Sequence, residues 1–439
     1  MNLSQIKFSR NFYILIIFFS FSIKFLLMPI SAHSDLLAIN MFPALIREGI
    51  LDIYSYIQSS NNPKIYFYHP IVYFFIGFFQ FFYSFFSNTF SSWMSDLRLV
   101  YLNSITSKST DYFIYTNNTG LFKDLFLMKI PYLIFDIFSL MLICKFIKLK
   151  LISKGNIILW LVNPILIYSA YIFGQFDVII CFFIFLGYIY LYKKKIYQAS
   201  LIWGIAGAFK IYPFIFVLPM ALIYAKTIKN FFVILTISLL PFVIFLIPSL
   251  ISNPELAIYS STVGNLNLYS KKISGWEHFS SLIKLTIFAF SYLIILISSI
   301  VLKVQNKWRL ALGINLITLL MFYTLFYRTH FHYLLWASPL IILWFKQAKI
   351  SSTIIILLTL SFASYKILAN QLQLGLFEPI NPEYFSSLPT FNEVINRFIP
   401  YRIVSTFGFI AFSLISLWIA VRVIKEFLFE EKIVTLKRK

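Results

Sequence analysis

About a dozen long apolar runs decide what this chain can fold into. A bilayer core of roughly 30 Å takes about 20 residues of helix to cross, and only helices or closed barrels satisfy every backbone polar group in lipid. We therefore predict an all-α fold, a polytopic transmembrane helical bundle of about 11–13 spans, with residues 1–439 forming a single integral membrane domain. The runs fall near residues 11–30, 70–86, 130–147, 156–173, 177–192, 199–225, 231–250, 281–302, 309–327, 331–345, 351–370 and 403–424.

The composition excludes the other broad classes. Of the 439 residues, 60% are apolar and 12% are charged, whereas a soluble chain has about 25% charged residues. Disordered chains are poor in aromatics, but aromatics make up 20% here. The two cysteines, Cys144 and Cys181, both stand in apolar runs, so a disulfide framework is not expected.

The net charge of +21 would suggest nucleic-acid binding in a soluble protein, but here it is typical of cytoplasmic loops. We expect no nucleic-acid partner. Basic clusters at 193–195, 226–229, 303–309, 346–349 and 437–439 predict the cytoplasmic ends of the helices. The first run is interpreted as a retained helix with a cytoplasmic N-terminus. The opposite, extracytoplasmic ends then comprise a first loop at 31–69 and loops 174–177, 251–280, 328–332 and 371–401. These segments hold most of the carboxylates and histidines, so the chemistry is expected on the extracytoplasmic side.

Two regions do not fit a simple alternation of spans. Runs 70–86 and 130–147 should both travel inward, so either a hidden crossing or re-entrant piece lies in the polar loop 87–128, or the basic stretch 145–154 violates the positive-inside rule. The run 199–225 carries Lys210 and Pro213 at its middle. Because proline interrupts helical hydrogen bonding, we predict two half-helices that meet there.

Three carboxylates lie in or beside apolar runs, where a charged group needs a structural partner or a functional role. Asp35 follows the first span and is either an interfacial or helix-capping residue or a general base. Asp177 either lies in an ordinary outer turn or faces a cavity or partner. Asp136 lies deeper, and a structural pairing with a lysine or arginine is favoured. Lys210 either snorkels or binds a phosphate group.

The outward junction Arg328 to Tyr333 and the segment Trp276-Glu277-His278 are further candidates. His330 and His332 would point apart on a helix but share a face in an extended turn. Two histidines without a zinc motif are a weak metal signal, so no metal site is predicted. A cationic pocket for an anionic leaving group fits this junction better.

Taken in order, these pieces resemble the GT-C superfamily of integral-membrane glycosyltransferases, in particular the users of dolichyl-phosphate mannose or glucose and their bacterial relatives. The resemblance spans about residues 30–340. It is carried by His33-Ser34-Asp35, Tyr68-His69-Pro70, Lys129-Ile130-Pro131 with Asp136, Asn163-Pro164 with Gly174-Gln175-Phe176-Asp177, Phe209 to Pro213, and Arg328 to Tyr333.

The resemblance implies an inverting transfer of a hexose, mannose or glucose, from a polyprenyl-phosphate sugar to a hydroxyl of a lipid-linked or cell-envelope acceptor. Asp35 would be the general base. The single acid in this loop makes a required divalent metal doubtful, and no other cofactor is expected. Donor phosphate would be bound by Lys210, Arg328, His330 and His332. Substrate contacts are expected from His33, His69, Gln175, Asp177, Tyr212, Glu277 and His278.

Two other classes compete with this interpretation. A secondary transporter or flippase for lipid-linked glycans has a similar number of helices, but it would show related halves and midplane sites. A purely structural membrane partner would leave Asp35, Asp177 and Lys210 unexplained. The composition, rich in Phe, Ile, Lys and Asn, suits an AT-rich genome, so a bacterial inner membrane is expected.

Overall fold

The computed structural model describes residues 9–59, 68–103, 115, 118–263, 275–302, 304, 306–326, 330–344, 352–366 and 373–438. Within these ranges every regular element is helical and no strand occurs. The elements are α1 (Arg10–Ile30), α2 (Ser34–Met41), α3 (Pro43–Arg47), α4 (Ile53–Gln58), α5 (Pro70–Tyr83), α6 (Phe90–Asn103), α8 (Leu121–Lys148), α9 (Asn156–Leu161), α10 (Pro164–Leu166), η1 (Ile167–Phe173), α11 (Asp177–Tyr192), α12 (Ile196–Phe209), α13 (Phe214–Tyr224), α14 (Ile228–Ser252), α15 (Pro254–Ile258), η2 (Tyr259–Val263), α17 (Gly275–Val301), α18 (Lys307–Leu325), η3 (Phe331–Ala337), α19 (Ser338–Trp344), α20 (Ser352–Lys366), η5 (Leu374–Phe377), α21 (Pro382–Ser387), α22 (Phe391–Asn396) and α23 (Tyr401–Arg438).

The predicted polytopic helical bundle is confirmed. Among the described residues, seven helices are long and apolar enough to cross a membrane, and six more apolar helices are shorter. Each predicted apolar run corresponds to one of these helices or to a pair of them. The long ones are α1, α8, the continuous stretch from α9 to η1, α14, α17, α18 and α23.

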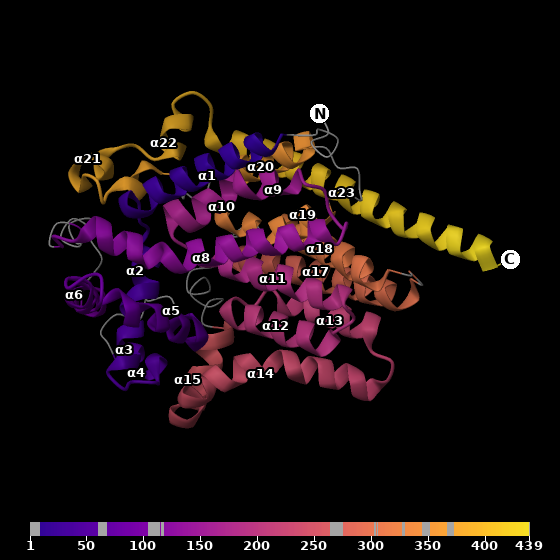
Figure 1. Cartoon of the computed structure of the whole chain (residues 1–439), viewed down its shortest axis with the longest axis horizontal. Helices are drawn as coiled ribbons and strands as arrows, with labels where there is room; N and C mark the ends of the chain where they lie inside the picture. Colours follow the sequence, from indigo (N-terminus) through magenta and orange to yellow (C-terminus); the bar gives the residue numbers. More distant parts are fainter. Residues whose placement is uncertain are drawn as a thin grey trace.

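The short elements gather at one end of the bundle (Figure 1). This end, which we call the loop end, holds α2 to α6, α15, α21 and α22, whereas α1 begins and α23 ends away from it. Elements from three of the predicted loop segments, 31–69, 251–280 and 371–401, therefore lie at the same end of the bundle.

The ambiguous region before α8 also lies at the loop end. With 14 residues and a rise of about 1.5 Å per residue, α5 is shorter than the bilayer core, and it packs against α2 and α3. The Thr89 hydroxyl, just before α6, donates to Asp124 in the first turn of α8 at 2.9 Å. α8 then runs away from the loop end, so α6 and the start of α8 both lie at that end (Figure 1).

The predicted pair of half-helices is confirmed as α12 and α13, which end and begin at Phe209 and Phe214. Small residues one turn apart let α12 approach α14 closely, as in other membrane helix pairs. Ser200 donates to the Ile234 carbonyl at 2.5 Å, and a Cβ on Gly204 would collide with the backbone of Ser238. This contact holds the broken helix against an unbroken one.

A buried ion pair connects α1 to α8. Lys24 of α1 lies 2.7 Å from Asp136 of α8, and both side chains are fully buried. Asp136 also accepts from Trp160 Nε1 and the Tyr171 hydroxyl, each at 2.7 Å. Charges in lipid normally pair in this way, so the predicted structural partner of Asp136 is confirmed as a lysine.

A second buried lysine ties two chain segments together near the loop end. Lys129 Nζ donates to the Ser31 carbonyl at 2.5 Å, to the Ser31 hydroxyl at 3.0 Å and to the Tyr171 carbonyl at 2.9 Å. Ser31 ends α1, and Tyr171 belongs to η1. The chain leads from these two points to Asp35 and to Gln175, so Lys129 fixes the spacing between them.

Candidate active site

Asp35 lies where the chain changes from one helix to the next at the loop end. Pro29 stands in the last turn of α1, and Ser31 is already extended. His33 is the N-cap of α2, and its Nδ1 accepts the amide proton of Asp35 at 3.1 Å. Asp35 is therefore in the first turn of α2, where the positive end of the helix dipole stabilises a carboxylate.

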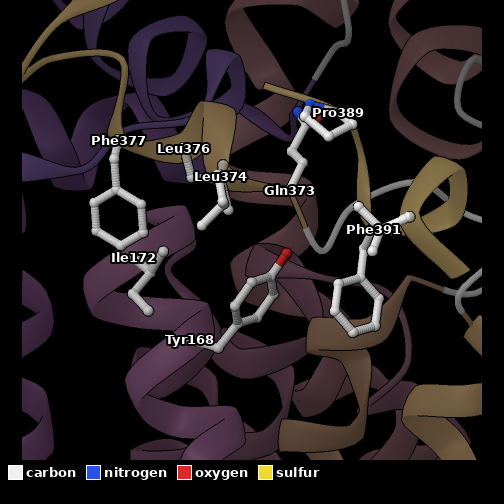
Figure 2. Close-up of a pocket in the computed structure, with 9 residues that line it drawn as sticks. Tyr168, Ile172, Gln373, Leu374, Leu376, Phe377, Pro389 and Phe391 are labelled. Carbon is white, nitrogen blue, oxygen red and sulfur yellow. The ribbon is translucent and has the colours of Figure 1, made fainter. Parts of the chain in front are cut away.

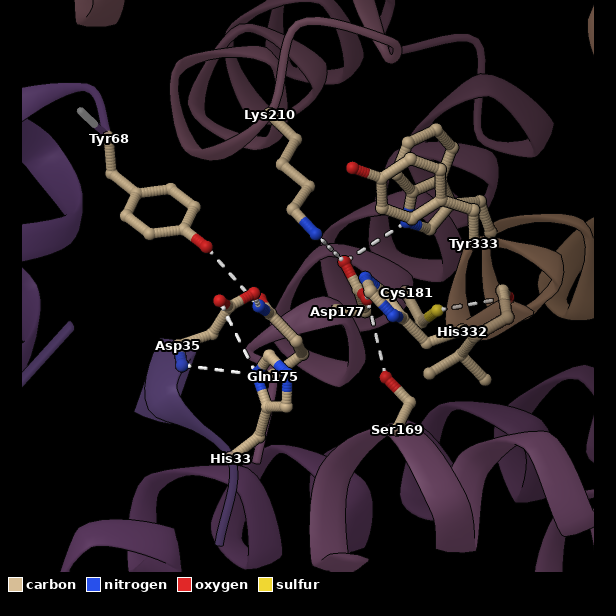
Figure 3. A network of polar contacts seen from close by, with 12 residues as sticks. His33, Asp35, Tyr68, Ser169, Gln175, Asp177, Cys181, Lys210, His332 and Tyr333 are labelled. Carbon is tan, nitrogen blue, oxygen red and sulfur yellow. Dashed lines mark hydrogen bonds and ion pairs between the residues drawn. The ribbon is translucent and has the colours of Figure 1, made fainter. Parts of the chain in front are cut away.

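A second turn brings Gln175 to this carboxylate. The π-helix η1 ends at Gly174, whose φ of +86° favours glycine. A Cβ there would come within 2.9 Å of Leu36 Cβ, so glycine also permits the close approach to α2. Gln175 Nε2 then donates to Asp35 Oδ2 at 2.6 Å and to the Tyr68 hydroxyl at 3.2 Å (Figure 3).

The surroundings keep Asp35 ionised. Burial alone would raise the pKa of its carboxyl group, but His33, His330 and Lys210 outweigh burial and lower the pKa below its ordinary value. The side chains of Asp35 and His33 are each 24% exposed, so the carboxylate can meet a ligand. Burial and the nearby Asp35 charge raise the pKa of Tyr68 well above its usual range, which keeps that hydroxyl protonated.

Asp177 forms a second polar centre at the start of α11. Its Oδ1 accepts from Lys210 Nζ at 2.6 Å and from Trp336 Nε1 at 3.0 Å. Its Oδ2 accepts from the Ser169 hydroxyl at 3.3 Å and lies 3.8 Å from His332 Nε2. The carboxylate is fully buried, so it orients its neighbours and does not itself face solvent (Figure 3).

Lys210 reaches this centre from the break between α12 and α13. Pro213 begins the second half-helix, and Lys210 is extended as the C-cap of the first. Its Nζ lies 5.0–5.4 Å from the ring centroids of Phe176, Tyr333 and Trp336, distances at which cation–π attraction operates. Its side chain is 12% exposed. Asp177 thus already balances the positive charge of Lys210.

The two predicted histidines lie together. His330 is extended before the 3₁₀-helix η3, and its ring is nearly parallel to that of His332, with 5.4 Å between centroids. On the other side, the Phe173 ring lies 4.8 Å from His332 and 3.8 Å from His33. Phe173 therefore contacts one histidine of each centre.

Three buried polar atoms among the described residues around these centres have no hydrogen-bond partner: Gln175 Oε1, His332 Nδ1 and the Tyr212 hydroxyl. In folded proteins more than about 90% of such atoms are paired. Gln175 Oε1 belongs to the Asp35 centre, and His332 Nδ1 belongs to the Asp177 centre. Because Gln175 uses its amide nitrogen on Asp35 and Tyr68, its amide oxygen remains available as a hydrogen-bond acceptor.

The structure brings together seven of the residues predicted for the site: His33, Asp35, Gln175, Asp177, Lys210, His330 and His332.

The other predicted residues lie at the edge of the site or cannot be placed. His69 caps α5, and its Nε2 is bonded to the Phe242 carbonyl at 3.0 Å. Burial lowers the pKa of His69 to about 4. Tyr212 is buried, with its ring stacked at 4.1 Å on Trp336. Arg328 lies outside the described residues, as do the side chains of Glu277 and His278.

Sequence reasoning missed three side chains that shape the site: Tyr68, Ser169 and Trp336. Tyr68 immediately precedes the predicted His69, and it is Tyr68 that reaches Gln175. Trp336 follows Tyr333 by three residues, and in a 3₁₀-helix such residues share a face; their rings stack at 4.1 Å. A predicted 3₁₀-helix over residues 331–337 would have placed Trp336 on the same face as Tyr333 and so in the site.

Comparison with known proteins gives one informative similarity. Over 105 residues the chain is 30% identical to GPI mannosyltransferase 1 of Saccharomyces cerevisiae. The match covers 23% of this chain and 26% of that protein, so the chain spans about a quarter of the length of the curated relative it matches. No family model matches the chain, and no solved structure matches it.

Proposed function

We propose that this protein is an inverting glycosyltransferase that moves a hexose, mannose or glucose, from a polyprenyl-phosphate sugar to a hydroxyl of a lipid-linked or cell-envelope acceptor. The observation that carries the proposal is the Asp35 centre. An ionised, partly exposed carboxylate is hydrogen-bonded to Gln175, whose amide oxygen is buried and unpaired. Lys210 and His330 are close enough to lower the pKa of Asp35, and Phe173 contacts both His33 and His332. The similarity to a mannosyltransferase supports the same class.

In the proposed reaction Asp35 is the general base. The acceptor hydroxyl binds between Asp35 and Gln175 Oε1 and gives its proton to the Asp35 carboxylate. Its oxygen then forms a bond to the anomeric carbon, while the bond from that carbon to the phosphate oxygen breaks. The electron pair leaves with the polyprenyl phosphate. A positioned base contributes typically 10²–10⁴-fold to such a step.

The leaving phosphate needs hydrogen-bond donors on the far side of the sugar. His332 Nδ1 is buried and unpaired, and Lys210 and His330 lie beside it. We propose that these side chains, together with Arg328, bind the phosphate and stabilise its growing charge, without a required divalent metal. Preorganised donors of this kind supply several kcal/mol to a transition state.

The membrane setting fits a lipid-borne donor. The bond that breaks in a polyprenyl-phosphate sugar lies at headgroup level, and the site lies among the short elements of the loop end. We propose that the loop end is extracytoplasmic and that the membrane is a bacterial inner membrane. The basic clusters at the opposite ends of the helices support this orientation.

The transporter alternative loses its main support in this arrangement. Lys210, on a broken helix, was the polar residue that best fitted a midplane transport site. Its ammonium group lies on Asp177 and is close enough to Asp35 to lower the pKa of that carboxyl group. Lys210 thus belongs to the same cluster as the proposed base.

The decisive experiment uses the full chain in lipid nanodiscs with radiolabelled polyprenyl-phosphate mannose or glucose and a panel of acceptors. We expect label to move to an acceptor and Asp35→Asn to abolish transfer while the protein still inserts and folds. Asp52→Asn is the matched control, because Asp52 caps α4 at the same end and asparagine also caps well. Normal turnover in Asp35→Asn would remove the proposed base.

A further inference from the structure

A cavity lies beside the proposed active site, under the segment that precedes α23. It has a volume of about 250 Å³ and opens between η1 and the chain from Gln373 to Val394 (Figure 2). Tyr168 and Ile172 form its floor, and Leu374, Phe377 and Phe391 form its other walls. Two chain segments about 200 residues apart therefore enclose it.

The lining of the cavity is almost entirely carbon. None of the nine residues around it is charged, and the only polar side chains are the Tyr168 phenol and the Gln373 amide. A sugar would need a hydrogen-bond partner for most of its hydroxyls, and a phosphate would need cations. The chemistry of the walls fits a hydrocarbon chain whose polar end lies at Tyr168.

The cavity is joined to the Asp35 centre by the backbone and by stacked rings. The Ala32 amide, three residues before Asp35, donates to the Leu376 carbonyl at 2.9 Å. The Tyr168 ring lies 5.8 Å from Phe173, which stacks on His33. The negative charge of Asp35 also acts on the Tyr168 hydroxyl. A molecule in the cavity would thus have its polar end near the proposed base.

The segment that covers the cavity carries apolar side chains on its outer surface. Phe398 is 83% exposed, and Ile380, Tyr384 and Ile399 are exposed as well. The segment is ordered by its own caps, including a reciprocal pair between Thr390 and Glu393 at the start of α22. Exposed apolar clusters on short helices at a bundle end are typical of contact with a lipid surface. A chain from the same leaflet could therefore reach the cavity.

We propose that this cavity binds the hydrocarbon chain of a lipid-linked acceptor and so holds its hydroxyl at Asp35. The inference rests on the proposed glycosyl transfer and names the substrate class of the same site. The acceptor is favoured over the donor because a donor chain is bonded directly to phosphate and must lead away from Lys210 and His332. This cavity instead lies next to Ala32 of the polypeptide, three residues before Asp35, because Leu376 in its lining accepts a hydrogen bond from the Ala32 amide.

The kinetic test compares two acceptors that differ only in their hydrocarbon chain, octyl α-mannoside and methyl α-mannoside. The full chain in nanodiscs is assayed with a polyprenyl-phosphate mannose donor. Val394→Trp narrows the cavity at a wall residue that is 36% exposed, so the larger ring can be accommodated without disturbing the core. We expect it to lower kcat/KM for the octyl acceptor about tenfold more than for the methyl acceptor, the effect of roughly two buried methylene groups. Phe398→Trp, on the same segment but outside the cavity, should leave the ratio unchanged.

An equal loss with both acceptors, or a rise in the donor KM alone, would overturn the proposal. A binding measurement separates this failure from failure of the proposed function. Octyl mannoside with a diazirine at its chain end is photolysed with the wild type, and we expect labelling within residues 373–394 that Val394→Trp abolishes. Labelling there by a diazirine-bearing polyprenyl phosphate, or labelling only elsewhere, would contradict an acceptor site. Cavity labelling without any sugar transfer would reject the transferase but keep the cavity.

Discussion

The Lys210–Asp177 pair makes a quantitative prediction about stability. Removing one partner of a buried ion pair costs about 3–5 kcal/mol, because a charge is left buried without compensation. In Lys210→Met, Asp177 stays fully buried but keeps the Trp336 N–H at 3.0 Å and the Ser169 hydroxyl at 3.3 Å. These two donors place the expected loss at the low end of the range, about 3 kcal/mol.

Substituting the acidic partner should lower the free energy of unfolding by less. In Asp177→Asn, the amide oxygen can still accept from Trp336, and Lys210 is 12% exposed and surrounded by three rings. The lost charged hydrogen bond is then worth about 1.5 kcal/mol. The double variant buries no unpaired charge, so it should be more stable than Lys210→Met alone. The expected coupling between the two sites is about 2–3 kcal/mol.

Equilibrium unfolding in mixed detergent micelles, followed by tryptophan fluorescence, gives the free energy of unfolding of the wild type, the two single variants and the double variant. The pair Arg98–Glu48 is the control, because its atoms are 2.9 Å apart but Glu48 is 46% exposed. The coupling of Arg98→Met with Glu48→Gln should stay below about 1 kcal/mol. Additive losses at Lys210 and Asp177, or a double variant less stable than Lys210→Met, would refute the reasoning from burial.

Three further substitutions test how the site is held. His33 is one of the groups that lower the pKa of Asp35, so in His33→Gln that pKa should rise and the acid limb of the kcat/KM profile should move to higher pH; an unmoved limb would contradict this. Lys129→Met removes three hydrogen bonds, each worth about 0.5–1.5 kcal/mol, and should lower kcat as well as the free energy of unfolding, measured on the same preparation. Gly174→Ala should lower kcat far more than Gly49→Ala, because both glycines have positive φ but only Gly174 faces a close neighbour, Leu36. Equal kcat values for the two variants would contradict a role for the close approach of Gly174 to α2.

The helical fold was predictable because its cause is local. Each membrane-crossing helix needs an uninterrupted apolar run, and such runs are visible without any knowledge of contacts. The break at Lys210 and Pro213 was also visible, since proline cannot donate the backbone hydrogen bond. By contrast, the apolar run 70–86 forms only the 14-residue helix α5. Its position against α2 and α3 depends on packing, which no local pattern encodes.

The site was predictable in its residue types but not in its pairings. A carboxylate in an apolar run must have a partner, and this rule correctly marked Asp136 and Asp177. It could not say that the partners are Lys24 and Lys210, 112 and 33 residues away. Lys210 was predicted as an open phosphate-binding cation, and its pairing with Asp177 changes how that role must be understood.

The pairing makes Lys210 a fixed charge whose direction is set before any ligand arrives. An unpaired lysine in this aromatic cage would be free to turn toward solvent, and a phosphate would have to order it on binding. With Asp177 holding one of its three protons at 2.6 Å, the ammonium is ordered in advance. The Lys210–Asp177 pair is neutral overall, so in the proposed reaction the leaving phosphate would be stabilised by hydrogen-bond donors of fixed direction, and not by the net charge of this pair. The acid that anchors Lys210 therefore sets the direction of its N–H donors before a ligand binds, while the lowered pKa of Asp35 keeps the proposed base ionised.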